Sequence, residues 1–264
     1  MTQHLWFQKW EGTGNDFIVV DDRAAAWGKL PDERVAALCD RHFGIGSDGL
    51  ILIQPPIQTG TAFHMDFRNP DGSRSFCGNG SRCAFAFWSA MHGRVEMAAF
   101  SAIDGAHHGQ WEGPEVAITI PDVTRVEQGV DGAEVDFLHT GSPHLLVWVP
   151  DVDAVDLPTD APPRRRTARF GPGGTNVNYV QVQERVLRMR TFERGVEAET
   201  WSCGSGVVAA ALGGLHRSLL SAPVKVHARG GVLRVEADRL QDGGFTGVRL
   251  IGPVRHVFSG ELDL

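Results

Sequence analysis

The chain has 264 residues, and its 25 basic side chains against 32 acidic ones give a net charge of −7 and an isoelectric point of about 5.9. This length fits one large domain or two of ordinary size. A hydrophobic content of 42% and a charged content of 22% are those of a globular protein, so a disordered or fibrous chain is excluded. The acidic balance argues against a surface for nucleic acid or anionic membranes, which needs clustered Lys and Arg.

Three further features bear on where the protein works. No apolar stretch approaches the roughly 18 residues of a membrane helix, and the N-terminus lacks the basic start and apolar core of a secretion signal. Four cysteines in a chain of this length do not make a disulfide scaffold. We therefore expect a cytoplasmic protein with reduced thiols and no membrane or nucleic-acid partner. The basic run Arg164–Arg166, with Arg169, lies in a Pro-rich stretch and is interpreted as a solvated loop.

In chain order, the pattern is rich in strands and has few helices. Short alternating or β-branched runs predict strands at 5–10, 17–21, 50–53, 62–67, 116–120, 145–149, 176–183, 186–191, 224–228, 232–237 and 247–251. Pro31-Asp32-Glu33 opens an amphipathic helix over 34–42, because it places Pro in the first turn and acids at the positive end of the helix dipole. Two helices, over 78–92 and 204–216, are apolar or small almost all round. A helix without a polar face belongs inside a fold.

The sequence also repeats itself at long range. Gly14-Asn15 recurs as Gly141-Ser142, 127 residues later, and Cys77-Gly78-Asn79-Gly80 recurs as Cys203-Gly204-Ser205-Gly206, 126 residues later. Two coincidences at nearly the same offset indicate a duplicated domain. We therefore predict an α/β (α+β) fold with two pseudo-symmetric domains, 1–121 and 122–253, in each of which strands surround one buried helix that begins at Cys-Gly-x-Gly.

A cysteine followed by glycines at a helix start has a defined chemistry. The first turn leaves backbone N–H groups without partners, and the helix dipole adds partial positive charge. Glycines let an anion approach these N–H groups, and the same field favours the thiolate of the cysteine. One such motif is most simply a packing cysteine. A pseudo-twofold axis, however, would bring Cys77 and Cys203 to opposite sides of one interdomain cleft, and two opposed thiols beside a carboxylate cradle suit inversion of the α-carbon of an amino acid.

The sequence motifs resemble those of the diaminopimelate epimerase family over essentially the whole chain. The matching segments are Gly12–Phe17, Phe43–Gly49, Asn69–Ser73, Cys77–Cys83, Gly141–His144, Thr175–Val177, Glu193–Gly195 and Cys203–Gly206. The resemblance implies two similar domains, each a mixed sheet or barrel wrapped around a central buried helix, with a C-terminal tail, about 254–264, that returns to the first domain. It also implies an active site in the interdomain cleft, diaminopimelate as the substrate in lysine and peptidoglycan precursor synthesis, no metal or organic cofactor, and a homodimer.

The resemblance also implies roles for individual residues. Cys77 and Cys203 match the two acid–base thiols of the family. Further matches are Gly78, Asn79, Gly204 and Ser205 for the carboxylate cradle, and Asn15, Asn69, Asn176, Glu193 and Arg194 for the rest of the substrate-binding set. A distal amino-acid group fits that set, because Arg194 offers a bidentate fork to a carboxylate and Glu193 offers an acceptor to an ammonium. Each asparagine taken alone would be interpreted as a turn or cap residue.

Three departures from the family pattern concern the details of distal recognition. Ser142 stands where the family commonly has Asn, Gly49 stands where some members have Gln, and the segment from Gly72 to Cys77 is about one residue shorter than usual. None of them affects the thiols or the Glu-Arg pair. Asp48, within Gly-Ile-Gly-Ser-Asp-Gly, is interpreted as a residue that closes a turn.

Alternative interpretations concern the remaining two cysteines and the choice of substrate. Cys39 and Cys83 are predicted to pack in the core, and a zinc site is disfavoured because the chain has no Cys-x-x-Cys pair. The closest alternative is a racemase of the same fold that acts on proline, hydroxyproline or histidine. Glu193 and Arg194 favour a substrate with a distal zwitterion instead. Isomerases that make phenazine precursors lack the two thiols, and a non-catalytic binding protein has no reason to keep both.

Overall fold

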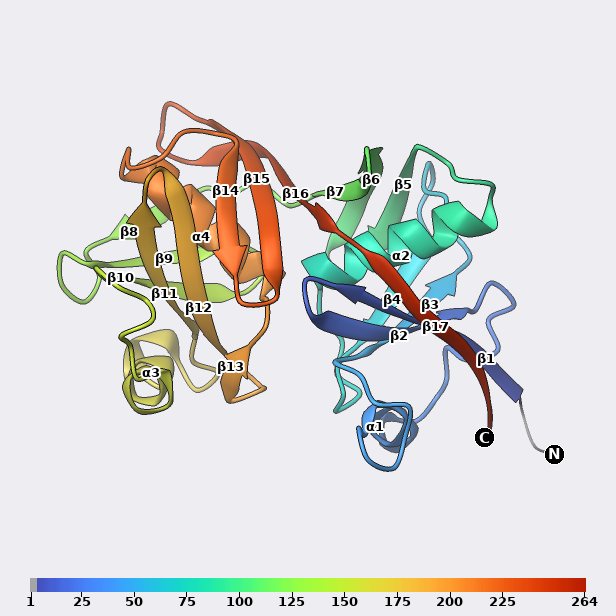
Figure 1. Ribbon diagram of the computed structural model, residues 1–264. Coiled ribbons are helices and arrows are strands. Elements are labelled where there is room, and N and C mark those ends of the chain that lie inside the picture. Colours follow the sequence, from blue (N-terminus) through green and yellow to red (C-terminus); the bar gives the residue numbers. More distant parts are fainter. Residues whose placement is uncertain (1–3) are drawn as a thin grey trace. The chain divides into compact units, whose positions relative to one another are not determined.

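The computed structural model describes residues 4–264, and these form two compact units (Figure 1). Unit 1 comprises the described residues up to Ile118 together with Gly252–Leu264, and unit 2 comprises Thr119–Ile251. The fold is mixed α and β, with many strands and few helices, as predicted. Within residues 4–264, no helix has both the length and the apolarity needed to cross a membrane.

Unit 1 contains a mixed sheet whose described strands follow the order β17-β1-β2-β3-β4-β5-β6-β7. The bounds are β1 (His4–Gly12), β2 (Asn15–Asp21), β3 (Leu50–Gln54), β4 (His64–Arg68), β5 (Met97–Ala102), β6 (Gly105–Glu112), β7 (Glu115–Thr119) and β17 (Arg255–Asp263). The pairs β2–β3 and β4–β5 are parallel, and the other neighbours are antiparallel. The C-terminal strand β17 therefore completes the edge of this sheet beside β1.

Two helices cover opposite faces of the sheet in unit 1. Leu50 and Leu52 of β3 pack with α1 (Asp32–Cys39), whereas Ile51 between them lies against Gly80 of α2 (Gly78–Met91). This follows from the alternation of side chains along a strand. The helix α2 is buried along almost its whole length, as its lack of a polar face predicted.

Unit 2 contains a second mixed sheet, in the order β8-β9-β10-β11-β12-β14-β15-β16. The bounds are β8 (Val126–Gln128), β9 (Val135–His139), β10 (Pro143–Trp148), β11 (Asn176–Gln183), β12 (Val186–Glu193), β13 (Ala198–Thr200), β14 (Val224–Ala228), β15 (Gly231–Arg239) and β16 (Phe245–Pro253). The short strand β13 folds back on the end of β12 as a hairpin. The helix α4 (Gly204–His216) packs against one face of the sheet, and α3 (Leu157–Arg165) packs against the other, where it is followed by the 3-10 turn Ala168–Phe170.

The two units repeat the same order of strand pairing. In each, eight described strands are joined by the sequence antiparallel, antiparallel, parallel, antiparallel, parallel, antiparallel, antiparallel. The buried helices α2 and α4 occupy the same crossover, between the strands of the second parallel pair. The place of β8 in unit 2 is taken in unit 1 by β17, which comes from the far end of the chain.

The structure has a strand at each predicted run, but it corrects one interpretation and adds several elements. The run Arg164–Arg166 was interpreted as a solvated loop, and this was wrong for Arg164 and Arg165, which form the last turn of α3. Arg165 is buried, because its guanidinium is paired with Glu197. The strands β5, β6, β8, β9, β13 and β17 were not predicted. Except in β9, their residues are largely polar, small or exposed, so they lack the alternation that identifies a half-buried strand. In β9 the apolar residues do not alternate regularly with polar ones, and Asp136 among them is buried.

Candidate active site

In unit 1, Cys77 is the N-cap residue of the buried helix α2. Its sulfur accepts a hydrogen bond from the backbone N–H of Gly80 at 3.3 Å. Gly78 and Asn79 form the first turn and are buried. A side chain at Gly80 would meet Ile51, Met65 and the Cys77 Cβ at 3.3–3.4 Å, so a larger residue would crowd this turn. The local sequence thus places a half-buried thiol at the positive end of a helix.

Asn15 and Asn79 form a hydrogen-bonded pair beside the Cys77 thiol. Asn79 Nδ2 donates to Asn15 Oδ1 at 3.2 Å, and the Cys77 sulfur lies 3.9 Å from the same oxygen. Asn15 Nδ2 donates to Asp48 Oδ2 at 2.7 Å. On the opposite side, Arg82 Nη1 donates to Asn79 Oδ1 at 2.9 Å. The orientation of both amides is therefore fixed, because a carboxylate accepts at one end and a guanidinium donates at the other.

Asp48 has a larger role than the turn residue inferred from the sequence. Its carboxylate accepts from Asn15 and from the backbone N–H of Asp16, and it forms an ion pair with Arg41 at 2.7 Å. Burial, followed by the charge of Asp16, raises the pKa of Asp48, whereas the hydrogen bonds from Asn15 and Asp16 lower it. No local pattern in the sequence indicates this contact, because Asp48 and Asn15 are 33 residues apart.

Asn69 lies elsewhere in unit 1, in the loop that follows β4. Its side-chain nitrogen donates to the Ser73 carbonyl, the Ser73 hydroxyl and the Ser75 hydroxyl, each at 3.1 Å. The backbone N–H of Asn69 also donates to the Ser73 carbonyl. In this structure its amide closes its own loop, as expected of an asparagine in a turn.

In unit 2, Cys203 is the N-cap residue of α4, and its surroundings differ from those of Cys77. Its sulfur lies 3.6 Å from the hydroxyl of Ser205, in the first turn of the helix that begins at Gly204. The backbone carbonyl of Ser205 accepts from Thr140 at 2.8 Å, which ties the helix start to the end of β9. A side chain at Gly206 would lie 2.6 Å from Asn178 Oδ1, so only glycine fits there.

His144 is a fully buried histidine beside Ser205, and its environment identifies its tautomer. Asn178 Nδ2 contacts the ring at Nδ1 (3.1 Å) while Asn178 Oδ1 accepts from Thr191, so the amide nitrogen is the donor. The ring proton is therefore on Nε2, which lies 2.9 Å from the hydroxyls of both Ser142 and Ser205. Burial lowers the pKa of His144 to about 3, so the ring is neutral at physiological pH.

Asn176 connects the start of β10, beside Ser142, to the β12–β13 hairpin, at whose turn Glu193 and Arg194 lie. Its Nδ2 donates to the Pro143 carbonyl at 3.0 Å and to the Ser142 hydroxyl at 3.3 Å, and its Oδ1 accepts from the backbone N–H of Arg194 at 2.8 Å. The Glu193 carboxylate accepts from Thr200 across the β12–β13 hairpin at 2.8 Å. The structure thus brings Asn176, Glu193 and Arg194 together, and the Arg194 side chain is exposed.

Arg165 was not predicted as a site residue. It supports the loop that precedes Asn176 and the turn that follows Arg194. It pairs with Glu197 at 2.7 Å and donates to the Gly173 carbonyl at 2.7 Å, while its own carbonyl accepts from the N–H of Thr175. Gly174 between these contacts has a φ of +64°, and a side chain there would lie 2.0 Å from the guanidinium. Arg165 therefore supports the loop before Asn176 and the turn after Arg194.

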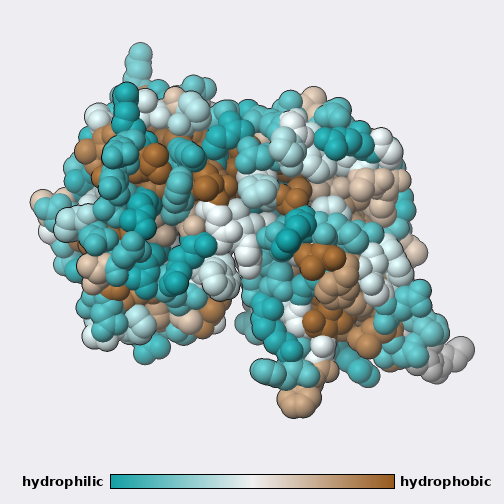
Figure 2. Space-filling view, viewed as in Figure 1, coloured by the Kyte–Doolittle hydropathy of each residue, from teal (hydrophilic) through white to brown (hydrophobic). Residues whose placement is uncertain are grey.

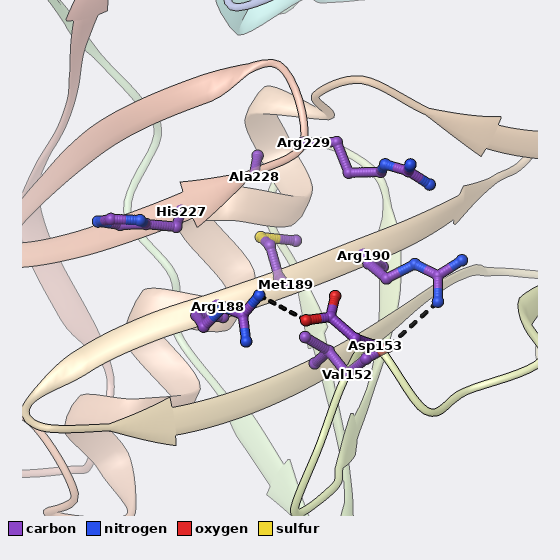
Figure 3. A pocket seen from close by; sticks show the side chains of 8 residues that line it. All are labelled: Val152, Asp153, Arg188, Met189, Arg190, His227, Ala228 and Arg229. Carbon is purple, nitrogen blue, oxygen red and sulfur yellow. Dashed lines mark hydrogen bonds and ion pairs between the residues drawn. The ribbon is translucent and has the colours of Figure 1, made fainter.

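A surface hollow of about 450 Å³ in unit 2 contains none of the predicted site residues. It is lined by Arg188, Arg190, Arg229 and His227 among others, and Figure 3 shows Arg188 turned toward Asp153. The cations in it are engaged, because Arg188 pairs with Asp153 and both Arg190 and Arg229 pair with Glu199. This hollow therefore offers no free charge to a ligand.

The remaining two cysteines, Cys39 and Cys83, are not at a helix start. Cys39 and Cys83 are buried, which confirms their predicted packing role. Burial raises the pKa of both thiols. Among residues 4–264, no three His, Cys, Asp or Glu side chains are grouped so that they could hold a metal ion.

Comparison with known proteins identifies one family over nearly the whole chain. The model of the diaminopimelate epimerase family matches residues 7–102 and 136–257. A diaminopimelate epimerase of Flavobacterium psychrophilum is 36% identical over 254 residues, which cover 95% of this chain and 97% of that protein. One from Aquifex aeolicus is 38% identical over 277 residues, with 97% of both chains covered.

Solved structures at low sequence identity share the fold. A phenazine biosynthesis protein of the PhzF family from Bacillus anthracis has a TM-score of 0.75 at 11% identity, covering 98% of this chain and 99% of that chain. A hydroxyproline epimerase from Agrobacterium vitis, with bound trans-4-hydroxy-L-proline, has a TM-score of 0.68 at 15% identity, covering 99% and 93%. Structural similarity at this level of identity shows a shared fold only, whereas the family model and the relatives show membership of a family. The chain belongs to the diaminopimelate epimerase family.

Proposed function

We propose that this protein is a diaminopimelate epimerase, an isomerase that interconverts LL-2,6-diaminopimelate and meso-diaminopimelate in lysine and peptidoglycan precursor synthesis. The observation that carries the proposal is the repeated cysteine at the start of a buried helix, Cys77 in one unit and Cys203 in the other, in a chain of this family. We also propose that the two units are epimerase domains derived by duplication. Their identical order of strand pairing supports this.

The proposed chemistry uses one thiolate and one thiol. The thiolate takes the α-proton, so that an S–H bond forms while the C–H bond breaks and its electron pair remains on the α-carbon as a carbanion. The second thiol then gives its proton to the opposite face and becomes the thiolate. N–H groups at the two helix starts, at Gly78, Asn79, Gly204 and Ser205, would hold the α-carboxylate, onto which the negative charge spreads.

Recognition of the distal end rests on charge and on oriented amides. We propose that Arg194 binds the distal carboxylate as a bidentate fork and that Glu193 accepts from the distal ammonium. Asn176 supports this assignment, because it fixes the backbone at Arg194. Asn15 and Asn69 complete the proposed set with neutral donors and acceptors, and for Asn69 this requires its amide to leave the loop contacts described above.

Hydrogen exchange in deuterated water tests the proposed reaction. The reduced protein, incubated with LL-diaminopimelate in deuterated water, is expected to form meso-diaminopimelate that carries deuterium at the inverted α-carbon. L-proline, trans-4-hydroxy-L-proline and L-histidine serve as competing substrates in the same assay. Exchange with one of these, and none with diaminopimelate, would replace the proposed function by that of another amino-acid racemase of this fold.

The mechanism requires both thiols to act on one substrate molecule, and oxidation tests this requirement. A pair of thiols that share one substrate is expected to form a Cys77–Cys203 disulfide in air, with loss of activity that a thiol reductant reverses. Saturating substrate should protect, because it would occupy the space between them. Peptide mapping that finds Cys39 or Cys83 in the bridge, or equal inactivation with and without substrate, contradicts the requirement.

We further propose a cytoplasmic homodimer. Exposed apolar side chains lie on neighbouring edge strands of unit 1, with Trp6 on β1 and Val257 and Phe258 on β17 each more than 40% exposed. Figure 2 shows hydrophobic residues gathered on the surface over this part of unit 1. Light scattering after size-exclusion chromatography tests the dimer, and Phe258→Asp is expected to shift the mass to that of one chain. A single chain in the wild type would contradict it.

A further inference from the structure

Arg82 is a fully buried arginine in the second turn of α2, five residues after Cys77. Its guanidinium donates to Asn79 Oδ1 at 2.9 Å and to the Thr13 hydroxyl at 3.4 Å, and its Nε has no hydrogen-bond partner. None of the carboxylates in residues 4–264 forms an ion pair with it. A buried cation without a paired anion is costly, since burial removes its hydration.

The charged and ionisable groups that face Arg82 identify where a compensating negative charge can form. They are Cys77 and Cys83 on α2, Glu11 on β1 and Glu115 on β7. Glu11 already forms an ion pair with Arg255 and accepts from the N–H of Gly14, and Glu115 is the weakest of the four in its attraction for Arg82. Cys83 is fully buried, and burial raises its pKa, so it stays a thiol. Cys77 differs because it is half-buried and accepts the N–H of Gly80 at the helix start.

The equivalent position in unit 2 carries no charge. The offset of 126 residues that relates Cys77 to Cys203 relates Arg82 to Val208, a buried apolar residue of α4. The groups near Cys203 are the Ser205 hydroxyl, which can donate or accept, and the neutral His144 ring. Arg194 interacts with His144 electrostatically, but it is exposed, so water screens its charge.

We propose that Arg82 stabilises the thiolate of Cys77, so that in the protein without substrate the half-site of unit 1 holds the base and that of unit 2 holds the acid. The thiolate forms by loss of the Cys77 proton to water, and no oxidant or co-reactant is needed. Before the proton is lost, the half-buried thiol can donate to Asn15 Oδ1 at 3.9 Å. The assignment of base and acid rests on the proposed function, whereas the effect of Arg82 on Cys77 does not.

The pH dependence of alkylation tests the proposal without any catalytic turnover. Iodoacetamide reacts with the thiolate, so its rate at each cysteine, followed by peptide mass spectrometry, rises with pH through that cysteine's own inflection. In the wild type, the inflection of Cys77 is expected to lie at least one pH unit below that of Cys203. A lower inflection at Cys203, or equal inflections, would overturn the proposal, and this measurement does not depend on any variant folding.

Three variants separate the charge from the packing. Arg82→Met removes the charge and is expected to raise the Cys77 inflection by one unit or more, a loss of about tenfold in alkylation rate near pH 7. Arg82→Lys keeps a cation and should retain most of the wild-type inflection. Val208→Met changes the volume at the equivalent position of α4 and should leave both inflections in place. An unchanged Cys77 inflection in a folded Arg82→Met protein, or an equal shift at Cys203, would contradict the role of Arg82.

Epimerase kinetics then distinguish this proposal from the proposed function. If alkylation behaves as expected but diaminopimelate is not epimerised, Arg82 still acts on Cys77 and only the assignment of base and acid is lost. If both hold, Arg82→Met should shift the acidic limb of the kcat/KM profile to higher pH, whereas structural damage alone would lower the profile without moving it.

Discussion

The two cysteines occupy the same place in two copies of one scaffold, yet their neighbours are of different chemical kinds. Around Cys77 lie the side-chain amides of Asn15 and Asn79. Their orientation is fixed by the carboxylate of Asp48 on one side and by the guanidinium of Arg82 on the other. Around Cys203 lie hydroxyls and a neutral imidazole, which can donate or accept as the reaction requires. The duplicated elements are the helix start and the cysteine, and the side chains beside them have diverged.

The units also differ in where charge is placed for recognition. Unit 2 has the hairpin β12–β13, which carries Glu193 and Arg194, whereas at the equivalent place after β4 the described part of unit 1 has only an isolated bridge between Arg68 and Arg74. Unit 1 instead has neutral Asn15 and Asn69 at its predicted binding positions. A substrate with two amino-acid groups needs one end inverted and the other end only held. A longer, charged hairpin on one copy meets that need without altering either helix start.

The largest expected effect comes from removing either thiol. Cys77→Ala and Cys203→Ala should each lower the rate of epimerisation by more than about 1000-fold, because each thiol serves one face of the α-carbon. Thermal unfolding should change only modestly, since alanine is smaller than cysteine at both N-cap positions and the cap hydrogen bond that is lost is the one from the Gly80 N–H to Cys77.

Cys83→Ala is the matched control for the thiol variants, because it removes a buried cysteine of the same helix and should lower stability rather than chemistry. A single active-site variant that kept more than a few per cent of the wild-type rate would contradict the two-thiol mechanism.

Arg194→Lys is expected to be the next most damaging change. Lysine keeps the charge but offers a point rather than a planar fork, so transition-state stabilisation should fall by about 2–4 kcal/mol in kcat/KM. Steady-state kinetics in both directions measure the loss. Arg185→Lys, in the exposed turn at the other end of β12, is the control. An unchanged kcat/KM in Arg194→Lys would remove Arg194 from the substrate site and reopen the choice of substrate.

Local patterns in the sequence were enough to locate the strands of the core and the two buried helices. Val, Ile and Leu runs such as 50–53 report burial directly, and the small, apolar faces of 78–92 and 204–216 could only lie inside a fold. The long-range repeat then placed Cys77 and Cys203 at equivalent positions. These features could be predicted because each depends on residues close together in the chain or on one repeated motif.

The supporting contacts could not be predicted, because each joins residues far apart in the sequence. Arg82 lies on a helix that is otherwise apolar, and its partner Thr13 is 69 residues away. Arg165 was misread because Pro162 and Pro163 lie inside α3, where prolines normally indicate a helix end. Its partner Glu197 is 32 residues further on. Contacts of this kind form only in the assembled fold, and a local sequence pattern does not predict them.

Arg165→Met tests whether the hairpin of unit 2 depends on its buried support. The change leaves Glu197 without its main partner and the Gly173 carbonyl without a donor. We expect a loss of about 2 kcal/mol in unfolding free energy, less than for a fully buried pair because Glu197 is partly exposed. KM should rise more than kcat falls, since the residues that the hairpin carries are proposed to bind.

Arg166→Met is the matched control for Arg165→Met. Arg166 also contacts Glu197, at 3.3 Å, but its side chain is 72% exposed, so its loss should change stability by less than about 0.5 kcal/mol. Equal effects of the two variants would mean that burial of Arg165 does not matter to the hairpin.

The smallest expected effect is the pH dependence of stability that comes from His144 of unit 2. His144 has a pKa of about 3 in the folded protein, lowered by burial, against about 6.5 when unfolded. The unfolded chain therefore binds the proton first as pH falls, so the stabilisation is complete above pH 6.5 and is lost progressively toward pH 3. By pH 5.5 this group should cost about 1.4 kcal/mol of unfolding free energy relative to pH 8.

Urea unfolding of the wild type and of His144→Gln between pH 8 and pH 5.5 isolates this contribution. Glutamine can donate and accept at positions similar to the ring nitrogens but does not titrate, so its stability should be lower at pH 8 and should fall less steeply on acidification. His42→Gln removes an exposed histidine of unit 1, which is not among the charges that act on His144, and should leave the wild-type slope in place. The asymmetry between the half-sites predicts no such group beside Cys77. A slope that is identical in His144→Gln and the wild type would mean that folding does not lower the pKa of His144, so that the folded protein binds this proton below about pH 6.5. The neutral surroundings assigned to Cys203 would then be wrong.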